Sequence, residues 1–312
     1  MWRVGFFYFG SRQSALDTGR YEAFVHGMRE RGYVEGKHFV LEARFADGQP
    51  ERLAALAAEL VRLKVDVLVV TGTPAHTAAR QATTSIPIVV TLSVDPVGEG
   101  WAASLARPGG NVTGVSIQTA DTNVKILELL MTVLPKLSRV AVQMNPANAP
   151  HRPLLQDVQA AAAQAGVEVL PVDGGTAEAI EHAFSTMARW RAEAVISWGD
   201  SFFVQERRRI AGLALQYRLP STYTTREYPE AGGLLSYGQD IKEGMRRAAT
   251  YVDKLLRGAK PGELPIEQPM KFELVINLKT AQAIMLEGSG QWDQSPSAWP
   301  SRTTACRDEL NP

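Results

Sequence analysis

The feature that most constrains this 312-residue chain is a regular alternation of short apolar runs with longer stretches of helical periodicity. The run 65–70 has the length and valine content of a buried strand, and the segment 53–61 before it repeats apolar residues at helical spacing. The same alternation predicts further strands over 4–9, 38–45, 86–92, 112–116, 139–144, 167–172, 194–197, 219–222, 233–237 and 271–277. Helices are expected between them, over 21–28, 75–83, 101–106, 122–134, 154–165, 177–190, 203–217 and 240–256, with a short one after 277. This order predicts an α/β fold of parallel sheets covered on both faces.

The pattern breaks near 116–121 and then starts again, and the length of the chain is that expected of two domains. We therefore expect two doubly wound parallel-sheet lobes, the first formed by residues 1–117 and about 238–287 and the second by 118–237. The last long helix and the last strand follow the second series, so they are free to return to the first lobe and form a multi-strand hinge. From 288 to 312 the residues lack any period, which predicts a disordered or atypical tail containing the single cysteine, Cys306.

The composition excludes several classes of protein. Lys and Arg total 33 and Asp and Glu total 33, and this zero net charge argues against a nucleic-acid partner. One cysteine leaves no intrachain disulfide, and no apolar run approaches the roughly 18 residues that span a bilayer. The first residues lead directly into VGFFYFGS, which is too short for a secretory signal. The chain is therefore expected to be either cytoplasmic or a mature or mis-started form of an exported protein.

In open α/β sheets ligands bind beyond the carboxyl ends of the strands, and this rule selects a few polar loops. The candidate ligand-binding residues in these loops are Ser11, Thr71, Thr73, Pro74, Ser93, Asp95, Asn145, Asp200 and Tyr237. Thr73 lies where a strand gives way to a helix, and there it can both cap the helix and reach a ligand carboxylate beside free N–H groups. The alternative, which the residue pattern alone favours, is an ordinary helix cap before Pro74.

Asp95 and Asp200 are candidate acidic groups for an ammonium or hydroxyl group, although either can instead act as a cap. Aromatic residues near the same loops would suit an aromatic or apolar ligand body, or else belong to the core: Tyr8, Phe9, Trp198, Phe202 and Tyr237. The five histidines form no metal pattern, and a GxGxxA match at 98–103 does not lie in a first strand–helix turn. Without a Walker loop or a GxSxG elbow, the sequence favours binding over catalysis and indicates no metal or cofactor.

Several motifs also give the chain a resemblance to a known family. GYVEGK, the strand-end TGTPA, the DPVG loop, ARPGGNVTG and INLKTA occur in this order, and the likeness covers roughly residues 3–283. On these motifs the chain resembles the substrate-binding proteins of ABC transporters, and more narrowly their tryptophan/tyrosine-type family. The resemblance implies the type I periplasmic-binding-protein fold, in which two α/β lobes joined by three crossovers hold a ligand in a cleft. It also implies a periplasmic or extracytoplasmic location.

The resemblance further implies a ligand and its contacts. Relatives are associated with aromatic amino acids, so the Thr73 loop would take a ligand carboxylate and Asp200 a ligand ammonium. The other residues implied to line the cleft are Ser11, Ser93, Asp95, Asn145 and Tyr237, and the positions that match the motifs are Thr71, Thr73, Pro74 and Asp95. The chain departs from the family in showing no signal and in ending in a polar tail instead of an apolar, Leu-rich segment.

Three functions are compatible with these features. The first is the solute-binding component of an ABC import system, a monomer that closes its lobes on a small molecule, such as an aromatic or other amino acid, and presents it to a membrane permease. The second is a two-lobed enzyme such as a racemase or epimerase, for which Asp95 and Asp200 would be the only acid–base pair. The third is a ligand-responsive regulator, which ranks last because no pair of DNA-binding helices precedes the first strand.

Overall fold

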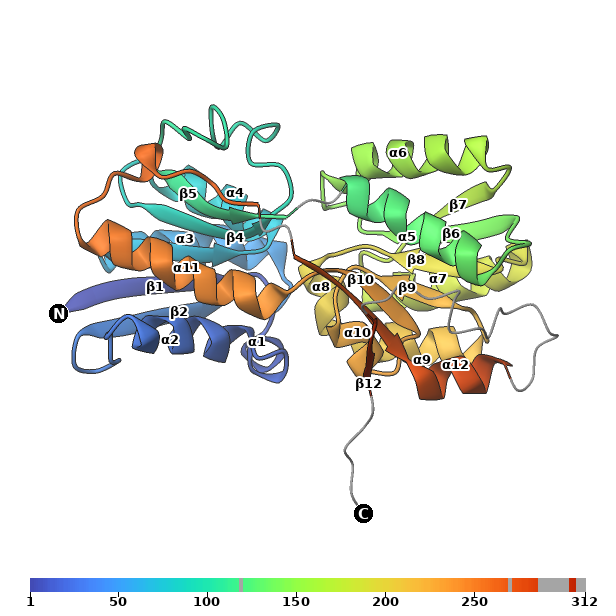
Figure 1. Cartoon of the computed structure of the whole chain (residues 1–312). Helices are drawn as coiled ribbons and strands as arrows, with labels where there is room; N and C mark the ends of the chain where they lie inside the picture. The colour runs from blue at the N-terminus through green and yellow to red at the C-terminus, as the bar shows by residue number, and fades with distance from the viewer. Residues whose placement is uncertain (118–119, 269–270, 286–302, 307–312) are drawn as a thin grey trace, which may run out of the picture. The chain divides into compact units, whose positions relative to one another are not determined.

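The computed structural model describes residues 1–117, 120–268, 271–285 and 303–306 (Figure 1). The chain divides into two compact units, the first made of Met1–Gln118 and Ile241–Met270 and the second of Thr119–Asp240 and Lys271–Pro312. It therefore passes between the units three times. Each unit is an α/β structure built on one sheet, which confirms the predicted fold class. Among the described helices, none is both long enough and apolar enough to cross a membrane.

The first unit has a five-stranded parallel sheet in the order β2-β1-β3-β4-β5. The strands are β1 (Trp2–Tyr8), β2 (Phe39–Phe45), β3 (Val67–Thr71), β4 (Ile88–Ser93) and β5 (Val112–Ser116). The helices are α1 (Arg12–Asp17), α2 (Arg20–Glu30), α3 (Leu53–Arg62), α4 (Thr73–Ala82) and α11 (Ile241–Leu256), with 3-10 turns at Pro50–Arg52 and Pro261–Glu263. Phe6 and Tyr8 pack in a core with α2 and α11, whereas Gly5 faces Leu60 of α3. Since successive strand residues point to opposite faces, helices cover both sides of the sheet.

The second unit has a sheet in the order β12-β11-β10-β9-β8-β6-β7, in which every neighbouring pair is parallel except β10 with β11. The strands are β6 (Arg139–Met144), β7 (Glu168–Asp173), β8 (Ala194–Ser197), β9 (Ser221–Tyr223), β10 (Leu235–Gln239), β11 (Phe272–Asn277) and β12 (Thr303–Cys306). The helices are α5 (Ala120–Val133), α6 (His151–Gln164), α7 (Ala177–Trp190), α8 (Ser201–Gln205), α9 (Arg207–Gln216), α10 (Glu227–Glu230) and α12 (Leu278–Met285). Phe184 of α7 and Ile210 of α9 share one buried cluster with Val195 of β8.

Two expectations about helices are wrong. No helix forms over 101–106, because the N–H groups of Trp101 and Ala102 both donate to the carbonyl of Pro96 and close a loop. The single helix expected over 203–217 is divided into α8 and α9, because the backbone at Glu206 (φ −87°, ψ 8°) leaves the helical region. The short helix α1 was not expected from the apolar pattern, since only Ser14 and Ala15 in it are buried.

The helix α11 and the strand β11 lie in different units, although both were expected in the first lobe. The helix α11 lies in the first unit, against α2. The strand β11 pairs with β10 in the second unit, because Leu274 and Ile276 complete a buried cluster with Leu129 and Leu235. In the tail, β12 pairs in parallel with β11, and the remaining residues of the tail, 288–302 and 307–312, lie outside the described part of the chain.

Candidate ligand-binding site

The carboxyl edge of the first sheet carries a row of hydroxyl groups. Tyr8, Thr71 and Thr91 are neighbours across β1, β3 and β4, and all three are buried. Thr91 Oγ1 donates to the carbonyl of Val70 (3.1 Å), so Thr71 donates the 2.5 Å hydrogen bond between the two threonine hydroxyls. Thr71 is therefore held inside the sheet, whereas the hydroxyl of Tyr8 has no partner within the described residues.

The loop after β3 turns into α4 at Gly72, whose φ of +96° is a conformation that glycine adopts without strain. Gly72 is the N-cap of α4, and Thr73 and Pro74 are its first two residues. The expectation that Thr73 caps this helix is therefore wrong. The N–H groups of Gly72 and Thr73 lie at the start of the first turn and have no acceptor within the helix, and the side chains of Thr73 and Pro74 are partly exposed. This helix start keeps the donors that a carboxylate requires.

The other predicted residues of the first unit have different roles. Ser93 ends β4, opposite Ser116 of β5, and both hydroxyls are buried without a partner in the described part of the chain. Asp95 is exposed and accepts a hydrogen bond from the N–H of Gly98 (2.7 Å), which closes a turn. Ser11 caps α1 by accepting a hydrogen bond from the N–H three residues on (3.0 Å). Asp95 and Ser11 thus stabilise local turns, whereas Ser93 keeps an unused hydroxyl.

Sequence reasoning missed Glu99, which lies one turn beyond Asp95 in the same loop. Burial raises the pKa of Glu99 to about 7, and the nearby charge of Asp95 adds to this effect. Its Oε1 atom is buried and has no hydrogen-bond partner among the described residues. The signal that could have pointed to it is a second carboxylate four residues after the first, in a loop with apolar neighbours.

The carboxyl edge of the second sheet holds a buried polar cluster centred on Asp200. Asp200 is the N-cap of α8, and its Oδ1 accepts hydrogen bonds from the N–H groups of Phe202 (2.8 Å) and Phe203 (3.2 Å). Its Oδ2 accepts hydrogen bonds from the side-chain amides of Asn148 (2.8 Å) and Asn145 (3.3 Å). The structure therefore brings two of the predicted residues, Asn145 and Asp200, into contact, and it adds Asn148, which sequence reasoning missed.

His151 completes this cluster. Its Nδ1 accepts a hydrogen bond from the backbone N–H of Asn145 (2.9 Å), so the proton of the neutral ring lies on Nε2, 3.4 Å from the carbonyl of Gly199. The ring packs edge-to-face on Trp198, with 5.3 Å between centroids. Burial lowers the pKa of His151, although the neighbouring Asp200 acts in the opposite direction. The sequence signal for Asn148 and His151 is their spacing of three and six residues from Asn145, across the loop that joins β6 to the start of α6.

Tyr237 lies in the middle of β10, apart from the Asp200 cluster, which is built on β6 and β8. Its ring stacks on Phe272 of β11, with a 5.5 Å centroid separation and an interplanar angle of 12°. It also packs against the buried cluster that contains Leu235. The aromatic surface expected at this residue is therefore used mainly for packing within the sheet.

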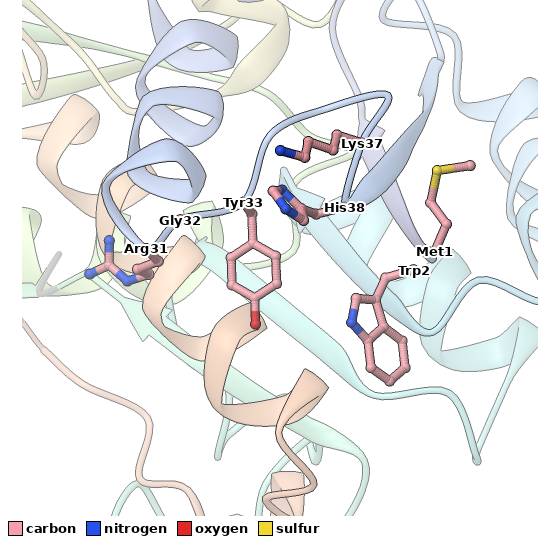
Figure 2. A pocket seen from close by; sticks show the side chains of 7 residues that line it. All are labelled: Met1, Trp2, Arg31, Gly32, Tyr33, Lys37 and His38. Atoms are coloured by element: carbon pink, nitrogen blue, oxygen red, sulfur yellow. The ribbon is translucent and has the colours of Figure 1, made fainter.

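A separate hollow of about 340 Å³ lies at the amino edge of the first sheet. Figure 2 shows the side chains of Tyr33, Lys37 and His38 around it, with Trp2 and Arg31 on either side. Trp2 begins β1 and His38 directly precedes β2, so this hollow is at the opposite end of the strands from Thr73 and Ser93. Ligands of open α/β sheets bind at the carboxyl ends, so we do not assign the ligand to it. No group of side chains suited to a metal ion occurs in the described residues.

Two α/β units, a chain that passes between them three times and polar loops at the strand ends define a type I periplasmic-binding-protein fold. The family model described as "ABC transporter substrate binding protein" matches residues 13–289. This chain belongs to the family of ABC transporter substrate-binding proteins.

Individual proteins are similar to this chain in sequence or in fold. A "Tyrosine-binding protein" of Clostridioides difficile is 24% identical over 273 residues, which cover 88% of this chain and 78% of that protein. A solved "conserved domain protein" of Vibrio cholerae is 26% identical, with a TM-score of 0.88 and coverage of 97% and 99% of the two chains. A Streptococcus pneumoniae ABC domain in complex with L-Trp is 24% identical, with a TM-score of 0.83 and coverage of 91% and 94%.

Proposed function

We propose that this chain is the solute-binding component of an ABC import system, that its ligand is an amino acid with an aromatic side chain, and that it delivers this ligand to a membrane permease. The observation that carries the proposal is the family match over residues 13–289. The choice of ligand is supported by two relatives, one named a tyrosine-binding protein and the other solved with L-Trp.

The proposed ligand contacts come from the strand-end loops of both units. The open N–H groups at Thr73 would receive the ligand carboxylate, and the polar cluster of Asn145 and Asp200 would face its ammonium end. The unused hydroxyl of Ser93 supports a further polar contact. Ser11, Thr71, Pro74, Asp95 and Tyr237 remain proposed as residues around the ligand.

Delivery requires that the ligand change the state of the protein. We propose that a ligand held by loops of both units favours a closed state, because it gains contacts from both units only there. The protein would act outside the cytoplasm, as a monomer and without a nucleic-acid partner. The proposal assigns no reaction to Asp95 and Asp200, since the first is tied into an exposed turn and the second accepts four hydrogen bonds from the protein.

The proposal is tested by calorimetric titration of the purified chain with L-tryptophan, L-tyrosine and, as controls, L-alanine and L-glutamate. We expect one aromatic amino acid to bind at one molecule per chain, to be recovered unchanged and to bind at least about tenfold more tightly than either control, which is about 1.4 kcal/mol. Racemisation or other turnover of the bound amino acid, followed by chiral chromatography, would contradict the binding function. Equal affinity for all four would contradict the aromatic specificity.

A further inference from the structure

The carboxylate of Asp200 has its acceptor positions filled by the protein itself. Two backbone N–H groups, of Phe202 and Phe203, donate to Oδ1, and two side-chain amides, of Asn145 and Asn148, donate to Oδ2. A carboxylate offers about four acceptor directions, so these four donors account for all of them. A ligand ammonium could reach this carboxylate only by displacing a donor that is already at hydrogen-bond distance. Asp200 is also only 6% exposed.

Asn148 is the side chain whose orientation this carboxylate determines. Because a carboxylate only accepts hydrogen bonds, the Nδ2 group of Asn148 must be the end that faces Asp200, 2.8 Å away. The opposite end, Oδ1, is buried and has no partner within the described residues, and the residue as a whole is 5% exposed. A buried acceptor without a donor is unfavourable, so this oxygen requires either a bound water or a donor on the ligand.

The other two side chains of the cluster, Asn145 and His151, do not offer an equivalent acceptor. Asn145 also donates through Nδ2 to Asp200, but its Oδ1 accepts a hydrogen bond from the N–H of Ala147 (3.0 Å). The Nδ1 of His151 accepts the N–H of Asn145, and its Nε2 directs a proton toward the carbonyl of Gly199. Of the three side chains that surround Asp200 in this part of the structure, Asn148 alone keeps a buried acceptor that the protein does not use.

We infer that Asn148 Oδ1 accepts a hydrogen bond from the ammonium group of the ligand, and that Asp200 is a positioning residue that orients the Asn148 amide. The inference rests on the proposed function, because it takes an amino acid as the ligand. The negative charge of Asp200 still favours a cation on the far side of Asn148, and donating to a carboxylate makes the Asn148 oxygen a stronger acceptor. Recognition of the ammonium thus depends on a neutral amide that the carboxylate holds in one orientation.

The test compares each aromatic amino acid with its analogue that lacks the ammonium group. The probes are L-tryptophan with 3-(indol-3-yl)propionate and L-tyrosine with 3-(4-hydroxyphenyl)propionate, titrated calorimetrically into the full chain. Asn148→Leu should weaken binding of the amino acid by about 10- to 100-fold, since a charge-assisted hydrogen bond is lost. Its affinity for the analogue should stay within about threefold of the wild-type value. If Asp200 itself bound the ammonium, Asn148→Leu would free its Oδ2 and the preference for the amino acid would persist. That result would overturn the inference.

A pair of isosteric variants covers the case in which Asn148→Leu does not fold. In Asp200→Asn, the new side chain must keep its oxygen on the N–H groups of Phe202 and Phe203, so its amide group faces Asn148 and takes the Oδ1 acceptor. Binding of the amino acid should again weaken by about tenfold or more. Adding Asn148→Asp to this variant supplies an acceptor at position 148 once more, and affinity should recover to within about threefold of the wild type. A double variant as weak as Asp200→Asn would contradict the inference.

The matched control is Asn111→Leu in the first unit. Asn111 is partly buried and likewise donates from Nδ2, to the carbonyls of Thr83 (3.2 Å) and Ile86 (2.9 Å), but it directly precedes β5, at the amino edge of the sheet. We expect it to lower the melting temperature without changing the preference for the amino acid over its analogue. A wild-type chain that binds neither amino acid would overturn the proposed ligand and this inference with it. Wild-type binding with an unchanged preference in the Asn148 and Asp200 variants would overturn only this inference.

Discussion

His76 is the residue whose burial has the clearest consequence for stability. It lies on α4, is 2% exposed, and its Nε2 is 2.8 Å from the carbonyl of Val70. Since a carbonyl only accepts, Nε2 carries the proton, and Nδ1 has no partner in the described part of the chain. Burial of the ring lowers the pKa of His76 from 6.5 to about 4. The folded protein therefore excludes the charged form that the unfolded chain adopts below pH 6.5.

We predict that His76 makes the protein less stable in mild acid. Above pH 6.5 both states hold a neutral ring, and as the pH falls toward 4 the unfolded chain binds a proton that the folded state refuses. The free energy of unfolding should fall by about 3 kcal/mol over this interval because of His76 alone. The variant His76→Gln removes the titration and keeps a donor for Val70, so its urea-unfolding free energy should vary less with pH. The exposed His182, changed to Gln, is the control, and a His76 variant with the wild-type pH slope would refute the prediction.

The residues of the candidate site were only partly predictable, for a physical reason. Strand-end position in an open α/β sheet was enough to select Asp200, Asn145 and Ser93. It could not identify Asn148 or His151, because these meet Asp200 only through the path of the loop after β6, which depends on backbone hydrogen bonds such as the one from the Asn148 N–H to the Asn145 carbonyl (3.0 Å). The sequence pattern alone also does not reveal that groups of the protein itself occupy every acceptor position of the Asp200 carboxylate.

At the scale of secondary-structure elements, the pairing of β4 with β5 depends on one glycine, Gly114. Gly114 has φ +132°, and a Cβ added there would lie 2.2 Å from the carbonyl oxygen of Val90 in the neighbouring strand. We predict that Gly114→Ala lowers the free energy of unfolding by about 3 kcal/mol, because both the backbone angle and the space oppose a side chain. Gly110→Ala is the matched control, since nothing lies within 4 Å of its added Cβ. Chemical denaturation of both variants checks this, and equal stability would contradict it.

Elements with a strong periodic pattern were predictable from the sequence, and elements that depend on distant contacts were not. The strand Arg139–Met144 and the helix Ala177–Trp190 have the expected bounds, because the spacing of their apolar residues is enough to identify each of them. The placement of β11 depends on its antiparallel register with β10, where Leu274 faces Tyr237, and such pairing between segments far apart in the chain leaves no local signal. The apolar residues over 101–106 predict a helix, but there the N–H groups of Trp101 and Ala102 close a loop on the Pro96 carbonyl instead of forming helical hydrogen bonds.

The molecule as a whole has two units, each with its own sheet and core. Whether a ligand contacts one unit or both can therefore be measured. Because separate cores can unfold in separate steps, calorimetry can register the two units as distinct transitions. A ligand that contacts only one unit stabilises that unit alone. A ligand held by loops of both units stabilises both, since unfolding of either one releases it.

We therefore predict that a saturating aromatic amino acid raises the melting temperature of both transitions. At a free concentration of about 100 times Kd, the stabilisation is about 2.7 kcal/mol. Thr73→Pro removes an N–H donor at the start of α4, and Asp200→Asn alters the polar cluster of the other unit, so each variant should reduce the shift in both transitions. L-alanine serves as the ligand control. A shift confined to one transition would mean that one unit holds the ligand by itself, and closure of two units on a shared ligand could then not be how this protein signals that it is loaded.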